Sequence, residues 1–382
     1  MKAIINGKVI TVTGKTYEKG VILYDKGKIV KVGENIKVPK GAEVIDASGM
    51  TVTPGLIDCH THLCVMHGQE TMPGHQDYNE MVDCSTPQVR ALDALNPFDP
   101  AIEQVRAAGF TTVYTGPGSA NVIGGKGCSF KLRGITADEM FIPGSEQMKM
   151  ALGENPKRIF GLNGKTPMTR MGTAAVARNY LTRAKEYAAK LDKGEKVDFD
   201  EKLAALVPVV KGEMKVRIHC HRADDIATAV RLCKEFGLKY ALEHATEGYK
   251  IAKVLADEGV YCTIGPLLLV PLKMEVWGLK QTTPGVLEKA GVNVCLTADG
   301  ANDTQWLPTY AGIVVRYGMS HEGALRALTI NPAHVMELED RIGSIEPGKD
   351  ADFAIFNGDP FSNYTECLMT IIDGEVLSDK RG

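Results

Sequence analysis

The stretch of sequence that decides the fold is Pro54-Gly55-Leu56-Ile57-Asp58-Cys59-His60-Thr61-His62. An apolar run of this kind is typical of a buried β-strand, whose side chains alternate between two faces. His60 and His62 therefore lie on the same face at the end of the strand, where both imidazoles can reach one metal ion. Two unrelated polar residues at a strand end would give the same pattern, so the rest of the chain has to decide between the two interpretations.

This run belongs to a series of eight apolar runs, several of which are followed by an amphipathic helical stretch. The runs are 52–59, 111–115, 128–132, 147–152, 215–219, 240–243, 260–264 and 292–297, and the helical stretches are 100–108, 174–193, 223–236 and 321–328. Repeated βα units are typical of a parallel sheet. Eight of them predict an α/β protein built on a (β/α)₈ barrel, which takes about 250 residues.

Both ends of the chain are rich in short β-type runs separated by Asn-Gly and other glycine turns. The simplest architecture brings these ends together beside the barrel. We therefore predict one composite β-rich unit from residues 1–51 and 341–382, next to a barrel of residues 52–340. Two long segments, 64–98 and 155–212, lie where barrels carry active-site loops, and His67 and His75 in the first of them are candidates for a lid.

Composition excludes several classes of function. The 382 residues include 44 basic and 47 acidic side chains with no run of like charges, which argues against nucleic-acid partners and a basic membrane face. No apolar run reaches the roughly 18 residues that a membrane span needs. Nine scattered cysteines without a C-x-x-C pair, and no apolar leader, predict free thiols in the cytoplasm. We expect small molecules as partners and leave open a homo-oligomer.

Three later strands also end in side chains that bind metals or transfer protons. They are His219, His244 and Asp299, each placed where an apolar run stops. In a barrel, the carboxyl ends of the strands form the active-site face, so such side chains gather at one mouth. The sequence therefore predicts a metal centre made of His60, His62, His219, His244 and Asp299.

These motifs, together with Gly343-Ser344-Ile345-Glu346-Pro347-Gly348-Lys349-Asp350-Ala351-Asp352-Phe353, resemble the amidohydrolase superfamily, in particular its imidazolonepropionase-like and prolidase-like branch. The resemblance covers almost the whole chain. It implies a distorted (β/α)₈ barrel with a small β-sandwich formed by both termini. It also implies one or two divalent metal ions, with zinc expected first, and hydrolysis of a carbon–nitrogen bond.

The resemblance also implies roles for single residues. His60 and His62 match the ligands of the first barrel strand, and His219 and His244 match those of the fifth and sixth strands. Asp299 matches the aspartate of the eighth strand, which binds metal and carries a proton from water to the departing nitrogen; we count His244 with Asp299 as catalytic. Independent chemistry agrees, because a bound Zn²⁺ can lower the pKa of water to about 7 and a nearby carboxylate can move the proton.

The fourth strand decides between one metal ion and two. Lys149 lies inside an apolar run, where a lysine is costly to bury unless its charge is altered or paired. Carbamylation would turn it into a bridging anion like that of binuclear relatives. Glu154, which follows the strand, is the alternative bridge, although it can also be a structural carboxylate at a helix start. A site with one metal ion and no bridge is the third alternative. Lys149 is the preferred bridge.

Candidate substrate contacts are His221, Asn121 and Arg222. His221 shares the face of His219 if the strand continues, Asn121 lies in the glycine-rich run 116–127, and Arg222 could clamp a carboxylate. Each has an ordinary structural explanation as well.

The reaction predicted is hydrolysis of an amide, lactam, N-acyl or dipeptide bond in a small molecule. Deamination of a heterocycle on the same metal site is the alternative. A non-catalytic barrel is disfavoured, because the chain keeps all five ligand positions.

Overall fold

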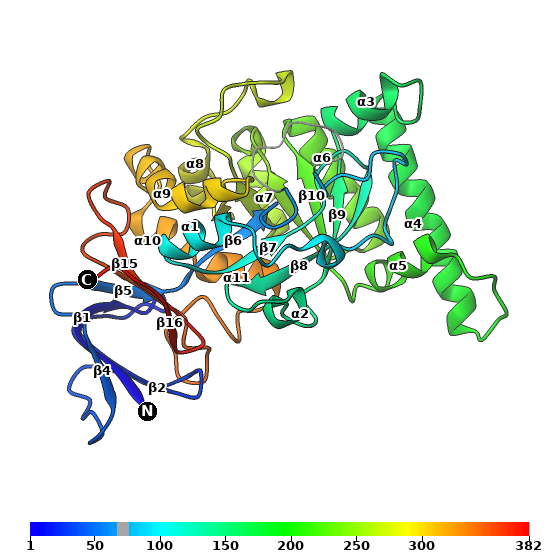
Figure 1. Ribbon diagram of the computed structural model, residues 1–382. Coiled ribbons are helices and arrows are strands. Elements are labelled where there is room, and N and C mark those ends of the chain that lie inside the picture. The colour runs from blue at the N-terminus through cyan, green and yellow to red at the C-terminus, as the bar shows by residue number, and fades with distance from the viewer. Residues whose placement is uncertain (67–75, 382) are drawn as a thin grey trace.

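The computed structural model describes residues 1–66 and 76–381 (Figure 1). His67 and His75 lie outside the described residues. The chain forms a nearly closed eight-stranded barrel sheet and a separate eight-stranded sheet to which both termini contribute. This arrangement confirms the predicted α/β fold, a distorted barrel with a terminal β-sandwich.

The barrel strands follow one another in chain order, from β6 to β13. They are β6 (Leu56–Thr61), β7 (Phe110–Thr115), β8 (Ile123–Lys131), β9 (Gln147–Ala151), β10 (Val216–Cys220), β11 (Tyr240–His244), β12 (Tyr261–Ile264) and β13 (Asn293–Leu296). The first and last strands approach each other through Thr297, whose hydroxyl donates to the His60 carbonyl at 2.5 Å. All eight predicted runs therefore contribute a barrel strand.

Helices cover the outside of the barrel, and a long helical excursion follows β9 (Figure 1). The helices are α1 (Ala101–Ala107), α2 (Ala137–Met140), α3 (Glu154–Gly161), α4 (Arg170–Asp192), α5 (Glu201–Val210), α6 (Ala223–Phe236), α7 (Ala252–Glu258), α8 (Thr283–Lys289), α9 (Leu307–Arg316), α10 (His321–Arg326) and α11 (Ile330–Met336). Short 3₁₀ turns are η1 (Ala91–Ala94), η2 (Gly248–Ile251), η3 (Met274–Val276) and η4 (Asn302–Trp306).

The third barrel strand departs from the predicted parallel pattern. β8 runs antiparallel to both β7 and β9, with Thr112 opposite Lys131 and Lys126 opposite Met148. A parallel crossover needs about a dozen residues or more, usually with a helix, whereas residues 116–122 are all that connect β7 to β8. The expectation of uniformly parallel βα units was wrong at this strand, and the short connection is the physical reason.

The predicted run 52–59 divides between the two sheets. β5 (Thr51–Pro54) pairs with β1 (Lys2–Ile10) and β14 (Phe353–Phe356) in the terminal sheet, and β6 begins two residues later in the barrel. Gly55 lies between the two strands and packs closely against β7. A β-carbon at this position would lie 2.2 Å from the Thr111 side chain. Only glycine leaves room for so close a contact.

The terminal sheet has the order β16-β15-β14-β5-β1-β2-β3, with β4 also paired to β1. Its remaining strands are β2 (Thr16–Asp25), β3 (Lys28–Gly33), β4 (Glu43–Asp46), β15 (Cys367–Ile372) and β16 (Glu375–Asp379). The sheet has its own apolar core, which includes Ile22 and Phe353 and is separate from the barrel core. The division at residues 51–52 and 340–341 stays a prediction.

Two further features bear on the expected class of protein. All nine cysteines are free thiols. Across the described residues, no helix combines the length and the apolar character that crossing a membrane requires.

Candidate metal centre

Two groups of ligand-capable side chains lie at the carboxyl ends of the barrel strands. The first is His60, His62 and Asp299, and the second is His219, His221 and His244. Within each group the candidate ligand atoms lie within 4.8 Å of one another. The ring centroids of His60 and His244 are 5.0 Å apart, so the two groups adjoin. All five predicted ligands therefore come together, and His221 lies among them.

Hydrogen bonds on the outer ring nitrogen fix the orientation of three imidazoles. Nδ1 of His62 donates to the Gly116 carbonyl at 2.9 Å, and Nδ1 of His244 donates to the Gly265 carbonyl at 2.6 Å. Nδ1 of His221 is hydrogen-bonded to Thr246 Oγ1 at 2.7 Å. With Nδ1 occupied, the lone pair on Nε2 is left for the centre, which is the arrangement that metal-binding histidines adopt.

His60 is held by a buried pair of opposite charges. Its Nδ1 lies 2.9 Å from Glu243 Oε2, and the other Glu243 oxygen contacts Arg217 Nε. The guanidinium also donates to the Cys59 carbonyl at 2.6 Å and lies over the Tyr114 ring. Burial opposes ionisation of Glu243, but the charges of Arg217 and His60 outweigh it and lower the pKa of the carboxyl. The ionised Glu243 therefore orients His60 with its Nε2 toward Asp299.

Asp299 is the acid of the centre and the member most open to solvent, with 30% of its side chain exposed. Its Oδ1 lies 2.9 Å from His60 Nε2, 3.6 Å from His62 Nε2 and 3.9 Å from His244 Nε2. Burial acts to raise the pKa of this carboxyl, but His244 and His60 have the larger effect and hold the pKa well below its ordinary value. Asp299 and His244 have φ of 61° and 66°, a left-handed region that few non-glycine residues occupy.

Burial keeps most of the imidazoles neutral. It lowers the pKa of His62 and of His244 to about 4, and it holds the pKa of His219 and His221 well below the ordinary value. His60 differs: burial and Lys149 lower its pKa, but Glu243 and Asp299 outweigh them and raise it. Neutral imidazole and ionised carboxylate are the forms that bind a divalent cation, so this donor set fits such a cation.

The two candidate bridges occupy different places. Lys149 is buried on β9 and its Nζ lies 3.5 Å from His60 Nε2. Burial lowers the pKa of Lys149 to about 8. Glu154 begins α3 after the strand has ended at Ala151, and its backbone N–H donates to Glu275 at 2.7 Å. Of these two residues, Lys149 is the one that contacts a predicted ligand within the part of the chain that the structure describes.

The predicted substrate contacts do not share one environment. His221 lies inside the second histidine group. Asn121 is buried and its amide donates to the backbone oxygens of Glu80 and Asp83. Arg222 is 45% exposed and forms a bidentate pair with Asp224 at the start of α6. The contacts of Asn121 and Arg222 are structural, in line with the ordinary explanation that each residue had.

Sequence reasoning missed three charged residues of this site: Arg217, Glu243 and Glu275. Arg217 and Glu243 have the same strand parity as His219 and face the inside of the barrel, and opposite charges at such positions in apolar strands were an available signal. Glu275 lies 3.8 Å from both His219 and His221. It follows the barrel strand by eleven residues in an irregular loop, so periodicity gave no signal for it.

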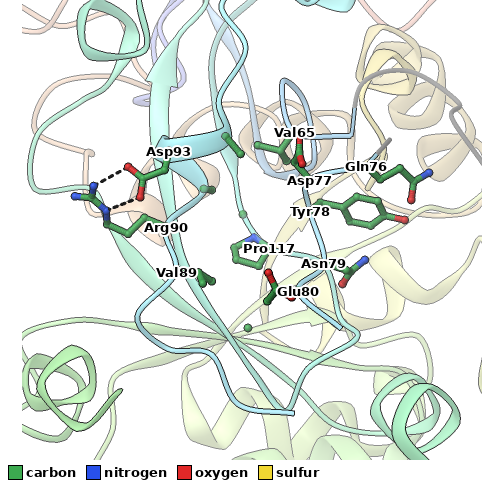
Figure 2. A pocket seen from close by; sticks show the side chains of 14 residues that line it. Val65, Gln76, Asp77, Tyr78, Asn79, Glu80, Val89, Arg90, Asp93 and Pro117 are labelled. Atoms are coloured by element: carbon green, nitrogen blue, oxygen red, sulfur yellow. Dashed lines mark hydrogen bonds and ion pairs between the residues drawn. The ribbon is translucent and has the colours of Figure 1, made fainter. Parts of the chain in front are cut away.

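A cavity of about 270 Å³ is lined by residues that include Val65, Tyr78 and Pro117 (Figure 2). Gly116, which accepts the hydrogen bond from His62, forms part of its wall together with Pro117 and Gly124. The Tyr78 ring, also in the wall, lies 5.1 Å from the His62 ring. Part of the glycine-rich run 116–127 thus separates the cavity from His62.

Comparison with known proteins agrees with this geometry. A family model described as the amidohydrolase family matches residues 51–377. The chain belongs to the amidohydrolase family. The crystal structure of an amidohydrolase from Thermotoga maritima MSB8 is 40% identical in sequence, with a TM-score of 0.94 over 99% of this chain and 100% of that one.

Two curated relatives of this amidohydrolase cover most of the chain. Amidohydrolase tasK from Hapsidospora irregularis is 28% identical over 94% of this chain, which spans only 40% of the length of tasK. An imidazolonepropionase from Geobacillus kaustophilus (strain HTA426) is 26% identical over 92% of this chain and 86% of its own length. These findings confirm the predicted family and the predicted class, a metal-dependent hydrolase of carbon–nitrogen bonds.

Proposed function

We propose that this amidohydrolase holds one or two divalent cations, with zinc the first choice, through His60, His62, His219, His244 and Asp299. The observation that carries the proposal is the convergence of these side chains, with the Nδ1 atoms of His62 and His244 bound to backbone carbonyls and that of His60 to Glu243. A bound divalent cation supplies a Lewis acid for the substrate carbonyl and hydroxide near neutral pH. The chain's own residues then direct the reaction.

Asp299 is the proposed proton carrier, and His244 holds it in place. Its Oδ1 accepts the proton that the attacking water loses and delivers it to the departing nitrogen, so the acid ends the cycle ionised as it began. Two features support this role: Asp299 is the member of the cluster most open to solvent, and its lowered pKa keeps it ionised, which is the form that can accept a proton. His60 and His62 orient the carboxylate through contacts of 2.9 and 3.6 Å.

Lys149 is the proposed bridge in a site with two metal ions. Its neutral Nζ would add to the carbon of CO₂ and release one proton, which leaves a carbamate with two oxygens for two cations. Burial on β9, a lowered pKa and the 3.5 Å contact with His60 support this choice. Glu154 lacks comparable support.

The proposed substrate is a small molecule with an amide, lactam, N-acyl or dipeptide bond, and the proposed compartment is the cytoplasm, in line with nine free thiols.

A substrate panel tests this function. N-acyl amino acids, dipeptides, cyclic amides and amino-substituted heterocycles are assayed in parallel for acid, amine and ammonia release. We expect hydrolysis of at least one amide or lactam, and Asp299→Asn should lower its turnover by at least about a hundredfold while the melting temperature stays near that of the wild type. Ammonia release from heterocycles alone would replace the proposal with the deaminase alternative. Unchanged turnover in Asp299→Asn would remove the proton carrier.

A further inference from the structure

Glu275 is a buried carboxylate that the predicted ligand set does not include. It lies in η3, on the loop between β12 and α8, and only 1% of its side chain is exposed. Its Oε1 lies 3.8 Å from His219 Nε2 and 3.8 Å from His221 Nε2. A buried carboxylate is costly unless it is paired or binds a cation. Lys273 pairs with Oε1 at 2.7 Å, and the same oxygen also faces the two imidazoles.

The surroundings fix one oxygen of Glu275 and leave the other toward the histidines. Oε2 accepts a hydrogen bond from the Glu154 N–H at 2.7 Å. Gly153 makes room for it, because a β-carbon there would lie 2.6 Å from Oε2. Among the described residues Oε1 accepts no well-directed hydrogen bond, and it pairs at 2.7 Å with the ammonium of Lys273.

The spacing of the donor atoms on Glu275, His219 and His221 fits a cation. Zinc binds nitrogen and oxygen ligands at about 2.0–2.2 Å, which places tetrahedral ligands roughly 3.3–3.6 Å apart. The 3.8 Å separations from Glu275 to His219 and His221 need only a slight contraction. His244 adjoins this set, since its ligand atom lies within 4.8 Å of those of the other two histidines.

We infer that His219, His221, His244 and Glu275 form a four-ligand position for a divalent cation such as Zn²⁺, next to the group of His60, His62 and Asp299. The inference goes beyond the proposed function, because it makes His221 and Glu275 ligands and not substrate contacts. Three imidazoles and one carboxylate suit zinc and similar cations.

Lys273 provides the positive charge when no cation is bound. Its Nζ lies 2.7 Å from Glu275 Oε1 and 3.0 Å from Asn155 Oδ1, so it can turn toward Asn155 when a cation takes its place. The competing explanation is a permanent Lys273–Glu275 ion pair that only shapes the loop. The first explanation predicts that removal of Lys273 tightens metal binding, and the second predicts that it leaves metal affinity unchanged.

Metal titration of the full chain distinguishes them. Protein stripped with a chelator is titrated with Zn²⁺ and with Co²⁺, and bound metal and the Co²⁺ absorption spectrum are recorded. Glu275→Gln should weaken the binding of one metal equivalent by at least about a hundredfold and change the spectrum, since it removes the charged ligand.

The same substitution at Glu247, which contacts Lys250 and the Ala223 N–H, is the matched control and should leave both metal equivalents bound. Lys273→Met should tighten the affected equivalent by about tenfold.

Equal titrations of the wild type and Glu275→Gln would overturn the inference, as would a Lys273→Met variant with unchanged affinity. If the variants do not fold, anomalous diffraction from wild-type crystals soaked in Zn²⁺ decides. Density within about 2.2 Å of a Glu275 oxygen supports the inference, and density confined to His60, His62 and Asp299 overturns it. A wild type that binds no metal at all would instead contradict the proposed function.

Discussion

At the scale of single residues, His60 is the point where a buried charge network meets the ligands of the site. Arg217 and Glu243 are both fully buried and pair with each other, and the second oxygen of Glu243 holds His60 Nδ1. Because Glu243 Oε2 lies 2.9 Å from Nδ1, Nε2 of His60 faces the centre. The network therefore sets the orientation in which His60 presents Nε2 to the centre.

Glu243→Gln tests this arrangement. The amide leaves the Arg217 charge without its buried partner, so we expect the free energy of unfolding to fall by about 3–5 kcal/mol. We also expect metal affinity to fall by about ten- to hundredfold, because His60 loses the acceptor that orients it. Urea denaturation and metal titration measure the two effects. Glu18→Gln, an exposed acid of the terminal sheet, is the control; an equal response of both variants would refute the role assigned to Glu243.

The residues also show how far sequence reasoning reaches at this scale. His60, His62, His219, His244 and Asp299 could be found because each stands at the end of an apolar strand, and strand ends meet at one mouth of a barrel. Glu275 could not, because only the path of an irregular loop brings it to His219. The substrate contact of Asn121 stays a prediction, since a polar residue in a glycine-rich loop can equally hold the loop itself.

At the scale of elements, the turn between β5 and β6 delivers the first ligand pair to the barrel. The chain leaves the terminal sheet at Pro54 and enters the barrel at Leu56, and Gly55 packs directly against Thr111 of β7. The position of β6 therefore depends on the absence of a side chain at residue 55.

Gly55→Ala should destabilise the protein by about 1–3 kcal/mol or more, since the added methyl overlaps Thr111 at 2.2 Å. Denaturation in urea measures the change. Gly33→Ala serves as the matched control, because a β-carbon there has its nearest neighbour at 3.5 Å and the backbone does not need glycine. If both variants lose the same stability, close packing at Gly55 does not explain the break between the strands.

Sequence patterns predicted which segments form strands and helices more reliably than the directions in which the strands run. Apolar runs and helical spacing located all eight barrel strands and the helices α1, α4, α6 and α10, because periodicity is a local property. The antiparallel course of β8 depends on what residues 116–122 can span, and the division of 52–59 depends on a contact with Thr111. Both are tertiary effects that no single run encodes.

At the scale of the whole molecule, Lys131 joins the barrel to the terminal sheet. It lies at the end of β8, is 2% exposed, and contacts Asp350 at 2.8 Å, Asp352 at 3.0 Å and also Asp373. These three acids could hold a metal ion by their spacing alone, but the ammonium of Lys131 already occupies the position between them. The cluster is therefore an ionic joint between the two sheets.

Lys131→Met should lower the free energy of unfolding by about 3–5 kcal/mol, because it leaves buried carboxylates uncompensated. Lys28→Met removes a half-exposed partner of the same Asp350 and should cost less than about 1 kcal/mol. Burial raises the pKa of Asp350, but Lys131 and its other partners lower it below the ordinary 3.8. The stability that ionised Asp350 contributes is therefore complete above pH 3.8, and it is lost as the pH falls through the lower pKa that Asp350 has in the folded protein. Similar losses in both variants would contradict the joint.

The central claim is that side chains far apart in the sequence converge to hold a divalent cation that activates water against a carbon–nitrogen bond. Elemental analysis of stripped protein, reconstituted with zinc in the presence and absence of bicarbonate, tests it most directly. We expect two equivalents per chain with bicarbonate, fewer without it, and a fall toward half in Lys149→Ala. Full loading of Lys149→Ala would remove the proposed bridge. A correctly folded chain that retains no zinc, manganese, cobalt, nickel or iron would contradict the account.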